Sequence, residues 1–522
     1  MKRFNVTGTC LPDKHYMCDV SAKFARCKEL IEDGDYYAIN FPRQHGKTTM
    51  KALLGKEFRK YDDYLVISTS FEGIGDTPFE SEKSLAQSFL LVMAKSFRFH
   101  NKELAQILKA SSEKIHSFDE LSEFLSEWIA SLNKKVVLLI DEVDKASNNQ
   151  VFISLLAMLR DKYLEAKEEM DITFHSVVLI GVHDIKSLKL KLRPEEEKKL
   201  NSPWNIAVDL DIDFTFSAKE IEKMIVDYAK EHSFNMNSSE IAKLLFFYTS
   251  GNPFLVSKFC QLIDEKFAGL KNIAWTVSNI ADAYKYLIDG NYTTTNFDDV
   301  DKNLENNEDL FNLVEDIVIN GGNHRFNISN PVISKGKTYG ILSQNSTGQC
   351  DVSNKVYEFR IMDYMLSKQQ TRENQLNLYA TTKFKENDEL NISLILEKFQ
   401  LFMKEHNSSK DNSFLEKNGR MLLMSFFRPI INGKGFMFKE NVTSEDRKMD
   451  LVITYNDKRY VIELKIWYGE KYLSDGIEQL CEYLDSYNLD EGHILIYNFN
   501  KNKKYEIKQV ENCRKDITAV FV

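Results

Sequence analysis

A loop that ends in Gly46-Lys47-Thr48 constrains the fold of this chain more than any other sequence feature. The preceding residues 36–42 form a short, mostly apolar run, and residues 50–58 suit a helix. A loop between a strand and a helix can offer backbone N–H groups and a helix N-terminus to phosphate oxygens. The pattern therefore predicts a site for the phosphates of a nucleoside triphosphate.

The expected contacts of this loop follow from its residue types. The Lys47 ammonium would bridge the outer phosphates, and the Thr48 hydroxyl would bind magnesium. Phe41 stands where the usual pattern has its first glycine, so a loop that has lost turnover is one alternative. The residues predicted to bind the nucleotide are Pro42, Arg43, Gln44, His45, Gly46, Lys47, Thr48 and Thr49, together with Asp141.

Further apolar runs indicate a parallel sheet. They occupy residues 64–69, 136–140, 177–182 and 206–212, and longer segments with helical periodicity separate them. Continuous apolar strands that alternate with helices are typical of an α/β fold with helices on both faces of the sheet. The second run ends in Asp141 and Glu142, where one carboxylate can hold magnesium through water and the other can activate the attacking water.

The loop and the acidic pair together resemble those of AAA-type ATPases, a resemblance that extends over about residues 5–288. It implies ATP as the nucleotide, magnesium beside Thr48 and Asp141, and a catalytic role for Glu142. It also implies an ATPase core at 1–216, a helical lid at 217–290, and assembly into a homo-oligomer, since AAA-type cores often form rings.

The same resemblance implies three further features: a sensing residue, an arginine supplied across an interface, and a lid turn. The sensing residue after the fourth strand would be His183 or Asp184, although an ordinary polar strand end fits equally well. The arginine supplied across an interface would be Arg160 or Arg193. Residues 250–256 resemble a lid turn near the nucleotide, and a plain helix-start turn explains them almost as well.

Size and composition narrow the class of protein. A chain of 522 residues, 43% of them hydrophobic, can form roughly three domains. The net charge of −10 disfavours a generic polyanion-binding surface. Without a leader or a run of about 18 apolar residues, we expect no membrane partner and a cytoplasmic location. The seven cysteines lack C-x-x-C spacing and are expected to be reduced thiols.

The middle of the chain is predicted to contain a winged-helix module at 291–368. Residues 291–309 are rich in Asn, Asp and Thr and are interpreted as a loop. Helices are expected at 308–319 and 331–342, and the alternating segment 355–361 is interpreted as part of the wing. A polar linker at 369–391 then leads to a separate α/β domain at 392–522.

Two acids and a lysine near the end of the chain predict a metal site. Asp450 starts an apolar strand, and Glu463 and Lys465 lie in the next strand after a tight turn at 456–458. Residues two apart share one face of a strand, so Glu463 and Lys465 point the same way. Two carboxylates and the backbone carbonyl of Leu464 suit magnesium, while the ammonium can orient the nucleophile or stabilise the transition state.

This spacing resembles the PD-(D/E)xK nuclease superfamily from about residue 391 onward, with Met449 in place of the proline. The resemblance implies a restriction-endonuclease-like fold, DNA as substrate, and magnesium or manganese as the metal. It also implies an acid on the first helix, best matched by Glu416, and a polar residue on the helix after the sheet, matched by Gln479. The sequence thus predicts an ATPase coupled to a DNA nuclease; the alternative is a nucleotide-switched ATPase whose last domain only binds nucleic acid or a protein partner.

Overall fold

The computed structural model divides the chain into two compact units. One comprises Met1–Tyr284 and Ser334–Ile341, and the other comprises Lys285–Ile333 and Leu342–Val522. The structure describes residues 2–146, 149–182, 206–208, 210–268, 273–320, 322–372, 384–386, 389–406, 420, 423–424, 426–427, 430–431, 435–440, 449–456, 458–498, 500, 503–512 and 514–522. The division expected from the sequence, into segments 1–216, 217–290, 291–368, 369–391 and 392–522, stays a prediction.

A parallel sheet forms the centre of the first unit, in the order β1-β4-β3-β2. Its strands are β1 (Tyr37–Asn40), β2 (Tyr64–Ser70), β3 (Lys135–Asp141) and β4 (Ser176–Gly181). The side chains of β3 after its first residue and all those of β4 are buried. Burial on both faces explains why these segments are continuously apolar in the sequence.

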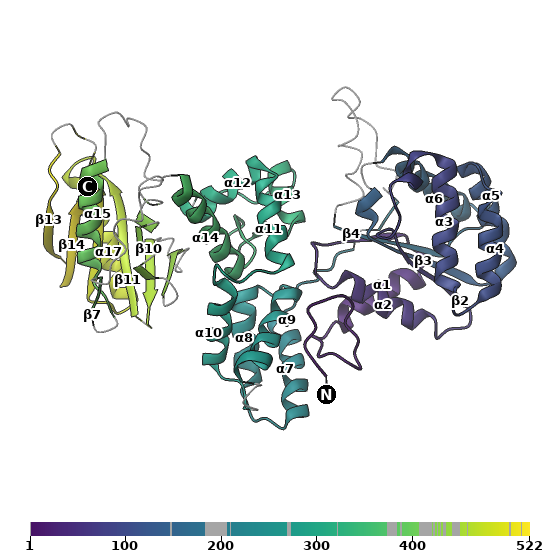
Figure 1. Ribbon diagram of the computed structural model, residues 1–522, viewed down its shortest axis with the longest axis horizontal. Coiled ribbons are helices and arrows are strands. Elements are labelled where there is room, and N and C mark those ends of the chain that lie inside the picture. The colour runs from purple at the N-terminus through teal and green to yellow at the C-terminus, as the bar shows by residue number, and fades with distance from the viewer. Residues whose placement is uncertain are drawn as a thin grey trace. The chain divides into compact units, whose positions relative to one another are not determined.

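Helices cover both faces of this sheet (Figure 1). On one face α1 (Ser21–Glu32) and α2 (Lys47–Phe58) enclose a core that contains Leu54, Val137 and Ile180. On the other face the core includes Phe89, Leu138 and Leu179. The helices of this second layer are α3 (Glu82–Phe97), α4 (Lys102–Ser112), α5 (Phe118–Leu132) and α6 (Gln150–Lys167). The predicted α/β fold with a helix-covered parallel sheet is confirmed.

The expected strand at 206–212 is wrong for the part of that segment that the structure describes. Val208 forms only an isolated parallel bridge with Tyr37. Aspartate is depleted in strands, and Asp211 and Asp213 alternate with the apolar residues of this segment. The alternation therefore places Leu210 and Ile212 against the core without forming a ladder.

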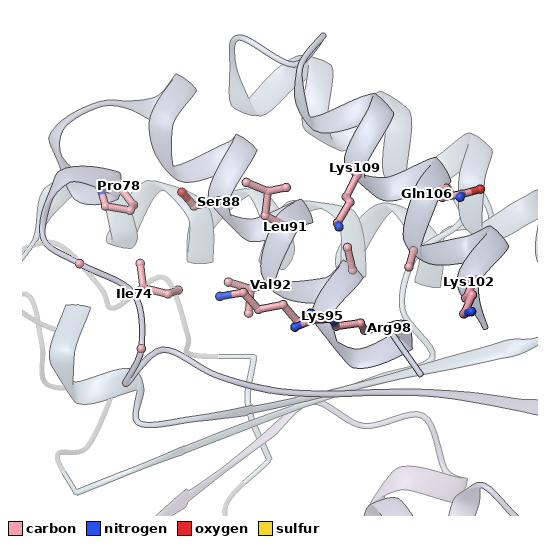
Figure 2. A pocket seen from close by; sticks show the side chains of 14 residues that line it. Ile74, Pro78, Ser88, Leu91, Val92, Lys95, Arg98, Lys102, Gln106 and Lys109 are labelled. Carbon is pink, nitrogen blue, oxygen red and sulfur yellow. The ribbon is translucent and has the colours of Figure 1, made fainter. Parts of the chain in front are cut away.

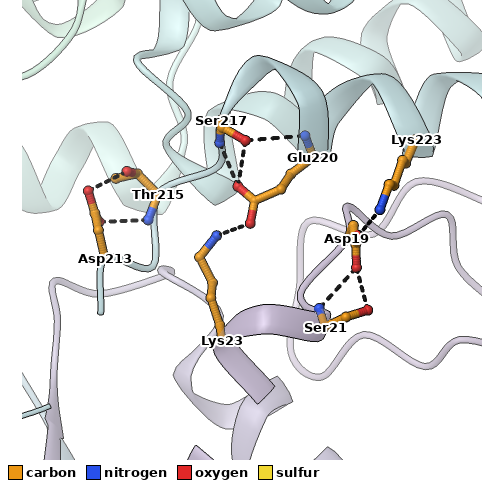
Figure 3. A network of polar contacts seen from close by, with 8 residues as sticks. All are labelled: Asp19, Ser21, Lys23, Asp213, Thr215, Ser217, Glu220 and Lys223. Carbon is orange, nitrogen blue, oxygen red and sulfur yellow. Dashed lines mark hydrogen bonds and ion pairs between the residues drawn. The ribbon is translucent and has the colours of Figure 1, made fainter. Parts of the chain in front are cut away.

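A helical region follows the sheet in the sequence. It contains α7 (Ala218–His232), α8 (Ser238–Thr249), α9 (Pro253–Leu262) and α10 (Val277–Ile288). A capping box starts α7: Ser217 N–H donates to Glu220 at 2.7 Å, and Glu220 N–H donates to the Ser217 hydroxyl at 3.3 Å. Polar contacts join this helix start to the start of α1, through the pairs Lys23–Glu220 and Lys223–Asp19 (Figure 3).

Two predictions for the middle of the chain are wrong. The polar segment 291–309 contains α11 (Thr295–Glu305), in which Phe297, Val300 and Leu304 are buried at helical spacing. Asn296 is buried beside them, and Asp298 and Asp299 lie on the opposite side, so composition alone suggested a loop. The alternating segment at 355–361 lies within α14 (Lys355–Arg372), because a short apolar pattern fits either a helix or a strand.

The rest of this region contains the elements that could form a winged-helix module. These are α12 (Glu308–Glu315), α13 (Pro331–Thr338), and a hairpin of β5 (Leu342–Gln344) and β6 (Cys350–Val352). The two helices begin where they were expected, although α13 is shorter than predicted.

The last part of the chain contains a six-stranded mixed sheet in the order β13-β14-β12-β11-β10-β9. Strands β9, β10 and β11 pair antiparallel, and β12 adds parallel to β11. The predicted turn is present, with Asn456 in the left-handed region at φ 46°. The elements are α15 (Ile392–His406), β9 (Gly435–Glu440), β10 (Met449–Tyr455), β11 (Lys458–Ile466), α17 (Glu470–Ser486), β12 (Glu491–Tyr497), β13 (Ile507–Asn512) and β14 (Lys515–Phe521). A short pair, β7 (Lys385–Glu386) and β8 (Glu389–Leu390), precedes them.

The cysteines correct one further expectation. Cys10, Cys18, Cys27, Cys260 and Cys350 are free thiols, as expected. Cys481 on α17 is instead disulfide-bonded. Sequence spacing alone does not show which distant segments a tertiary fold brings within bonding range.

Candidate functional site

The phosphate-binding loop lies between β1 and α2, as the sequence predicts. Gly46 precedes α2 at φ 78°, and Gln44 is also left-handed at φ 60°. Lys47, Thr48 and Thr49 form the first turn of the helix, where backbone N–H groups lack intrahelical partners. The loop is therefore built as an anion-binding concavity at a helix N-terminus.

Phe41 does not occupy a left-handed position. Its backbone N–H donates to the Gly181 carbonyl at 3.2 Å, and its ring packs against Phe214 with 4.5 Å between the ring centroids. The left-handed residues of the loop are Gln44 and Gly46. The glycine that the usual pattern has at this place is thus not needed for the loop conformation seen here.

The Lys47 ammonium is held inside the loop. It donates to the carbonyl oxygens of Phe41 at 2.6 Å and Pro42 at 2.8 Å. Burial lowers the pKa of Lys47 to about 8, although the carboxylates of Asp144, Glu142 and Asp141 oppose that shift. The position of this cation suits a phosphate group bound by the loop N–H groups.

His45 is also buried in the loop. Its Nδ1 lies 3.0 Å from the Arg43 carbonyl oxygen, and burial lowers the pKa of the imidazole to about 4. The ring is therefore neutral at physiological pH and adds no charge to the site.

Asp141 and Glu142 end β3 next to this loop. Asp141 is 3% exposed and accepts the Glu142 N–H at 3.0 Å. Burial, followed by the neighbouring Asp141 carboxylate, raises the pKa of Glu142. A carboxylate with a raised pKa is better suited to accept a proton from water.

The sequence reasoning missed two charged residues of this site. Lys51, one turn after Lys47 on α2, forms an ion pair with Asp141 at 3.0 Å and donates to the Thr69 carbonyl at 3.1 Å. Asp144 accepts the backbone N–H of Val182 at the end of β4. The i, i+4 spacing of the two lysines and the acid three residues after Asp141 were the available signals.

Gly181 allows the close approach of Asp144 to β4. A Cβ atom at this position would lie 2.9 Å from the Asp144 Oδ2. The Asp144 carboxylate, which follows β3, thus binds the backbone at the end of β4. The sensing residue is expected directly after this point in the sequence.

The other nucleotide-site candidates are only partly described. His183, Asp184 and Arg193 lie outside the described residues. Arg160 lies on α6, with its guanidinium 3.6 Å from Asp161. The turn at 250–256 forms the start of α9, where Asn252 accepts the Leu255 N–H at 3.1 Å. A Cβ on Gly251 would lie 1.9 Å from the Phe216 carbonyl oxygen, so packing against the start of α7 requires glycine there.

A second polar cluster lies on the carboxyl-terminal sheet. The Lys465 ammonium on β11 is 2.7 Å from the Glu463 Oε1 and donates to the Gln479 Oε1 of α17 at 3.3 Å. Glu463 is 1% exposed, while the Lys465 side chain is 28% exposed. Three of the residues singled out by the sequence therefore meet at the face between β11 and α17.

The close approach of α17 to this cluster depends on Gly476. A Cβ atom there would lie 2.8 Å from the Lys465 Cε and 3.1 Å from the Ile494 Cδ1. The glycine thus lets the helix pack over the lysine stem.

The remaining residues of this candidate site are described less fully. Asp450 lies in β10, which pairs antiparallel with β11. Leu451 is paired with Ile462, so position 450 adjoins position 463 on the neighbouring strand. The side chain of Asp450 lies outside the described part of the structure. Leu464 lies between Glu463 and Lys465 on β11. Glu416 lies outside the described residues. Among the described side chains, no group of three or more His, Cys, Asp or Glu could hold a metal.

Three of the solved structures that match this chain are distant from it in sequence. The Walker-type ATPase PABY2304 of Pyrococcus abyssi is 12% identical, with a TM-score of 0.45, over 69% of this chain and 99% of that chain. The Aeropyrum pernix ORC2 protein in its ADPNP–ADP complexes is 9% identical, with a TM-score of 0.42, over 69% and 98%. The Thermotoga maritima RuvB Holliday junction branch migration motor is 16% identical, with a TM-score of 0.34, over 68% and 98%.

The family assignment depends on the sequence match and not on these distant structures. No curated protein matches the chain. The AAA-like domain family matches residues 11–360, which include the phosphate loop, the acidic pair and the helices that follow them. The chain therefore belongs to the AAA-like domain family, as an ATPase of the P-loop AAA-like type.

Proposed function

We propose that this protein hydrolyses ATP and that its nucleotide state controls a metal-dependent DNA nuclease in the last domain. The observation that carries the nuclease proposal is the contact of Lys465 with both Glu463 and Gln479. A lysine placed between a buried carboxylate and an amide can orient a water molecule or stabilise charge on a phosphate.

ATP hydrolysis is supported by the geometry of the first unit. Lys47 is available for the outer phosphates, Thr48 and Asp141 for magnesium, and Glu142 for the attacking water. Lys51 neutralises the buried Asp141 carboxylate at 3.0 Å, so this acid does not leave an uncompensated charge beside the loop.

The residues near β10 and β11 fit a magnesium ion chemically. Glu463, Asp450 and the Leu464 carbonyl would supply hard oxygen ligands, which magnesium prefers. Glu463 is almost completely buried, and a buried carboxylate is stable only next to cations or hydrogen-bond donors. When bound, the metal would acidify a water molecule and neutralise charge on the phosphate. Glu416 and Gln479 complete the proposed catalytic set, and manganese is an alternative metal.

A second function has its own support. The salt bridge that Lys465 makes with Glu463 also fits a domain that binds nucleic acid or a protein partner without cutting it. In that case the protein is a nucleotide-switched regulatory ATPase. Substrate cleavage distinguishes the two functions directly.

The test is incubation of the full chain with linear, plasmid and single-stranded DNA, and with RNA, in magnesium or manganese, with and without ATP. We expect metal-dependent cleavage of DNA by the wild-type protein. Asp450→Ala and Lys465→Ala should each lower the cleavage rate by at least about 100-fold while ATP turnover persists.

Lys471→Ala is the matched control, because Lys471 is an exposed lysine of α17 outside the cluster. It should cleave like the wild type. Intact substrates under all of these conditions would reject the nuclease and favour the regulatory switch. Cleavage that survives both Asp450→Ala and Lys465→Ala would place the active site elsewhere.

A further inference from the structure

A cationic groove on the ATPase unit is lined by residues that belong to neither of the two sites described above. It has a volume of about 660 Å³ and is lined by α3, α4 and the loop that follows β2 (Figure 2). Leu91 and Val92 of α3 and Ala105 of α4 form part of its apolar floor, and Ile74 contributes from the loop. Neither the nucleotide site nor the carboxyl-terminal cluster uses these residues.

Four cations surround this floor: Lys95, Arg98, Lys102 and Lys109. Lys95 and Arg98 lie next to each other at the end of α3, and Lys109 points toward them from α4 (Figure 2). The described residues that line the groove include no carboxylate. None of the four cations is within ion-pair distance of an acid among the described residues, although the whole chain carries a net charge of −10.

The spacing of these residues explains why the charges gather on one side. Ser88, Leu91, Lys95 and Arg98 recur at intervals of three or four along and just beyond α3, and Lys102, Gln106 and Lys109 do so along α4. Residues with this spacing share one face of a helix. Two helices of an antiparallel pair therefore present their cationic faces to the same groove.

An aromatic side chain marks the turn between the two helices. Phe99 is 81% exposed, which is unusual for a large apolar side chain, and the Arg98 guanidinium lies 5.3 Å from its ring centroid. Exposed aromatic rings beside cations provide stacking surfaces for the bases of unpaired nucleic acid. An acidic peptide would use the cations but would gain nothing comparable from the ring.

We propose that this groove binds a single strand of nucleic acid, with the phosphates on Lys95, Arg98, Lys102 and Lys109 and a base on Phe99. An unpaired strand leaves its bases free to stack on the exposed Phe99 ring, whereas a duplex does not, so the groove and the ring together fit one strand. The occupant is thus a single-stranded polyphosphate, and DNA and RNA share the chemistry that the groove recognises.

The groove is one loop away from the acidic pair of the nucleotide site. The loop begins at Phe71, whose N–H donates to the Asp141 carbonyl at 2.9 Å, and then lines the groove with Gly73, Ile74 and Gly75. A strand bound there would contact the same loop that adjoins the end of β3.

The test measures binding of fluorescent oligo(dT), oligo(rU), duplex DNA and polyglutamate to the full chain, by anisotropy over a range of salt concentrations. EDTA and the Lys465→Ala background prevent cleavage, so a failed nuclease proposal does not affect the readout. We expect both single strands to bind more tightly than the duplex and polyglutamate. The two single strands reveal whether DNA or RNA is preferred.

The double variant Lys95→Gln/Lys109→Gln should weaken single-strand binding about tenfold or more. The slope of log affinity against log salt should fall in magnitude by about 1.4, since each neutralised phosphate contributes about 0.7. Phe99→Ala should weaken binding about tenfold without changing that slope, because stacking carries no charge. Lys83→Gln/Lys114→Gln removes two exposed lysines outside the groove and should bind like the background protein.

Several outcomes would overturn the proposal. One is equal single-strand affinity of the groove variant and the lysine control, provided that circular dichroism shows both to be folded. Another is tighter binding of polyglutamate than of oligonucleotides, which would assign the groove to acidic peptides. If the double variant fails to fold, Phe99→Ala still decides, because an unchanged single-strand affinity would reject the stacking of a base on Phe99 beside the groove.

Discussion

At the scale of single residues, the buried Lys47 is the most consequential side chain of the nucleotide site. Its ammonium is enclosed by the carbonyls of Phe41 and Pro42, and burial lowers its pKa to about 8. The Lys47 ammonium therefore loses its proton at a lower pH than the ammonium of an exposed lysine. Bound phosphates would favour the charged form, because an opposite charge nearby raises the pKa of an ammonium.

This shift predicts a pH dependence for nucleotide binding. Below about pH 8 Lys47 is already charged, so the affinity for ATP should be constant; above it, binding requires uptake of a proton. The dissociation constant should therefore rise about tenfold between pH 7 and pH 9. Titration with a fluorescent ATP analogue checks this, and His45, with a pKa of about 4, does not titrate in that range. An affinity that stays flat to pH 9 would contradict the prediction.

At the scale of elements, the start of α7 combines a cap with an ion pair. Glu220 accepts the Ser217 N–H at 2.7 Å within the capping box and also pairs with Lys23 of α1. Burial acts to raise the pKa of Glu220, but the Lys23 and Ser217 contacts outweigh it and lower the pKa. A lowered carboxylate pKa stabilises the fold above the unfolded value, and that stability is lost as the pH falls through the folded pKa.

We predict that Glu220→Gln destabilises this junction by about 1 kcal/mol at neutral pH, mainly through the weakened cap and ion pair. The difference from the wild type should shrink below about pH 4, where an unperturbed glutamate is protonated. Urea unfolding followed by circular dichroism at pH 7 and at about pH 3, toward the lowered pKa of folded Glu220, measures both effects. Glu222→Gln on the same helix is the control and should have little effect. A pH-independent difference would mean that the charge of Glu220 is not responsible.

At the scale of the whole molecule, the question is how ATP and the last domain are linked. Glu142, with its raised pKa, is proposed to activate the attacking water, whereas Lys47 and the loop are proposed to hold the phosphates. Removing only the proton acceptor should therefore separate ATP binding from hydrolysis.

Glu142→Gln should keep ATP bound and lower phosphate release by at least about 100-fold. If the ATP-bound state activates the nuclease, this variant should cleave DNA in ATP at least as fast as the wild type. If turnover drives cleavage, both activities should fall together. Phosphate release and DNA cleavage measured in the same samples distinguish these outcomes. Unchanged phosphate release would indicate that Glu142 is not the general base that activates the attacking water.

The sequence alone determined the elements whose signals are local. The phosphate loop, the acidic end of β3, the capping box at Ser217 and the β10–β11 turn each depend on neighbouring residues. Local signals also misled where two structures fit the same short pattern, as in α14, and where polar composition suggested a loop, as in α11. A polar composition does not exclude a helix that buries only a few apolar residues.

Only the tertiary structure decided which distant residues meet. The pairing of Lys51 with Asp141, the contact of Lys465 with Gln479, and the common groove of α3 and α4 all join different elements. Residue spacing predicts which side of a helix or strand a residue occupies, but the packing of one element on another determines what that side faces. The residue types of the candidate sites could therefore be recognised in the sequence. Which charged side chains contact one another was determined only by the packing of the elements.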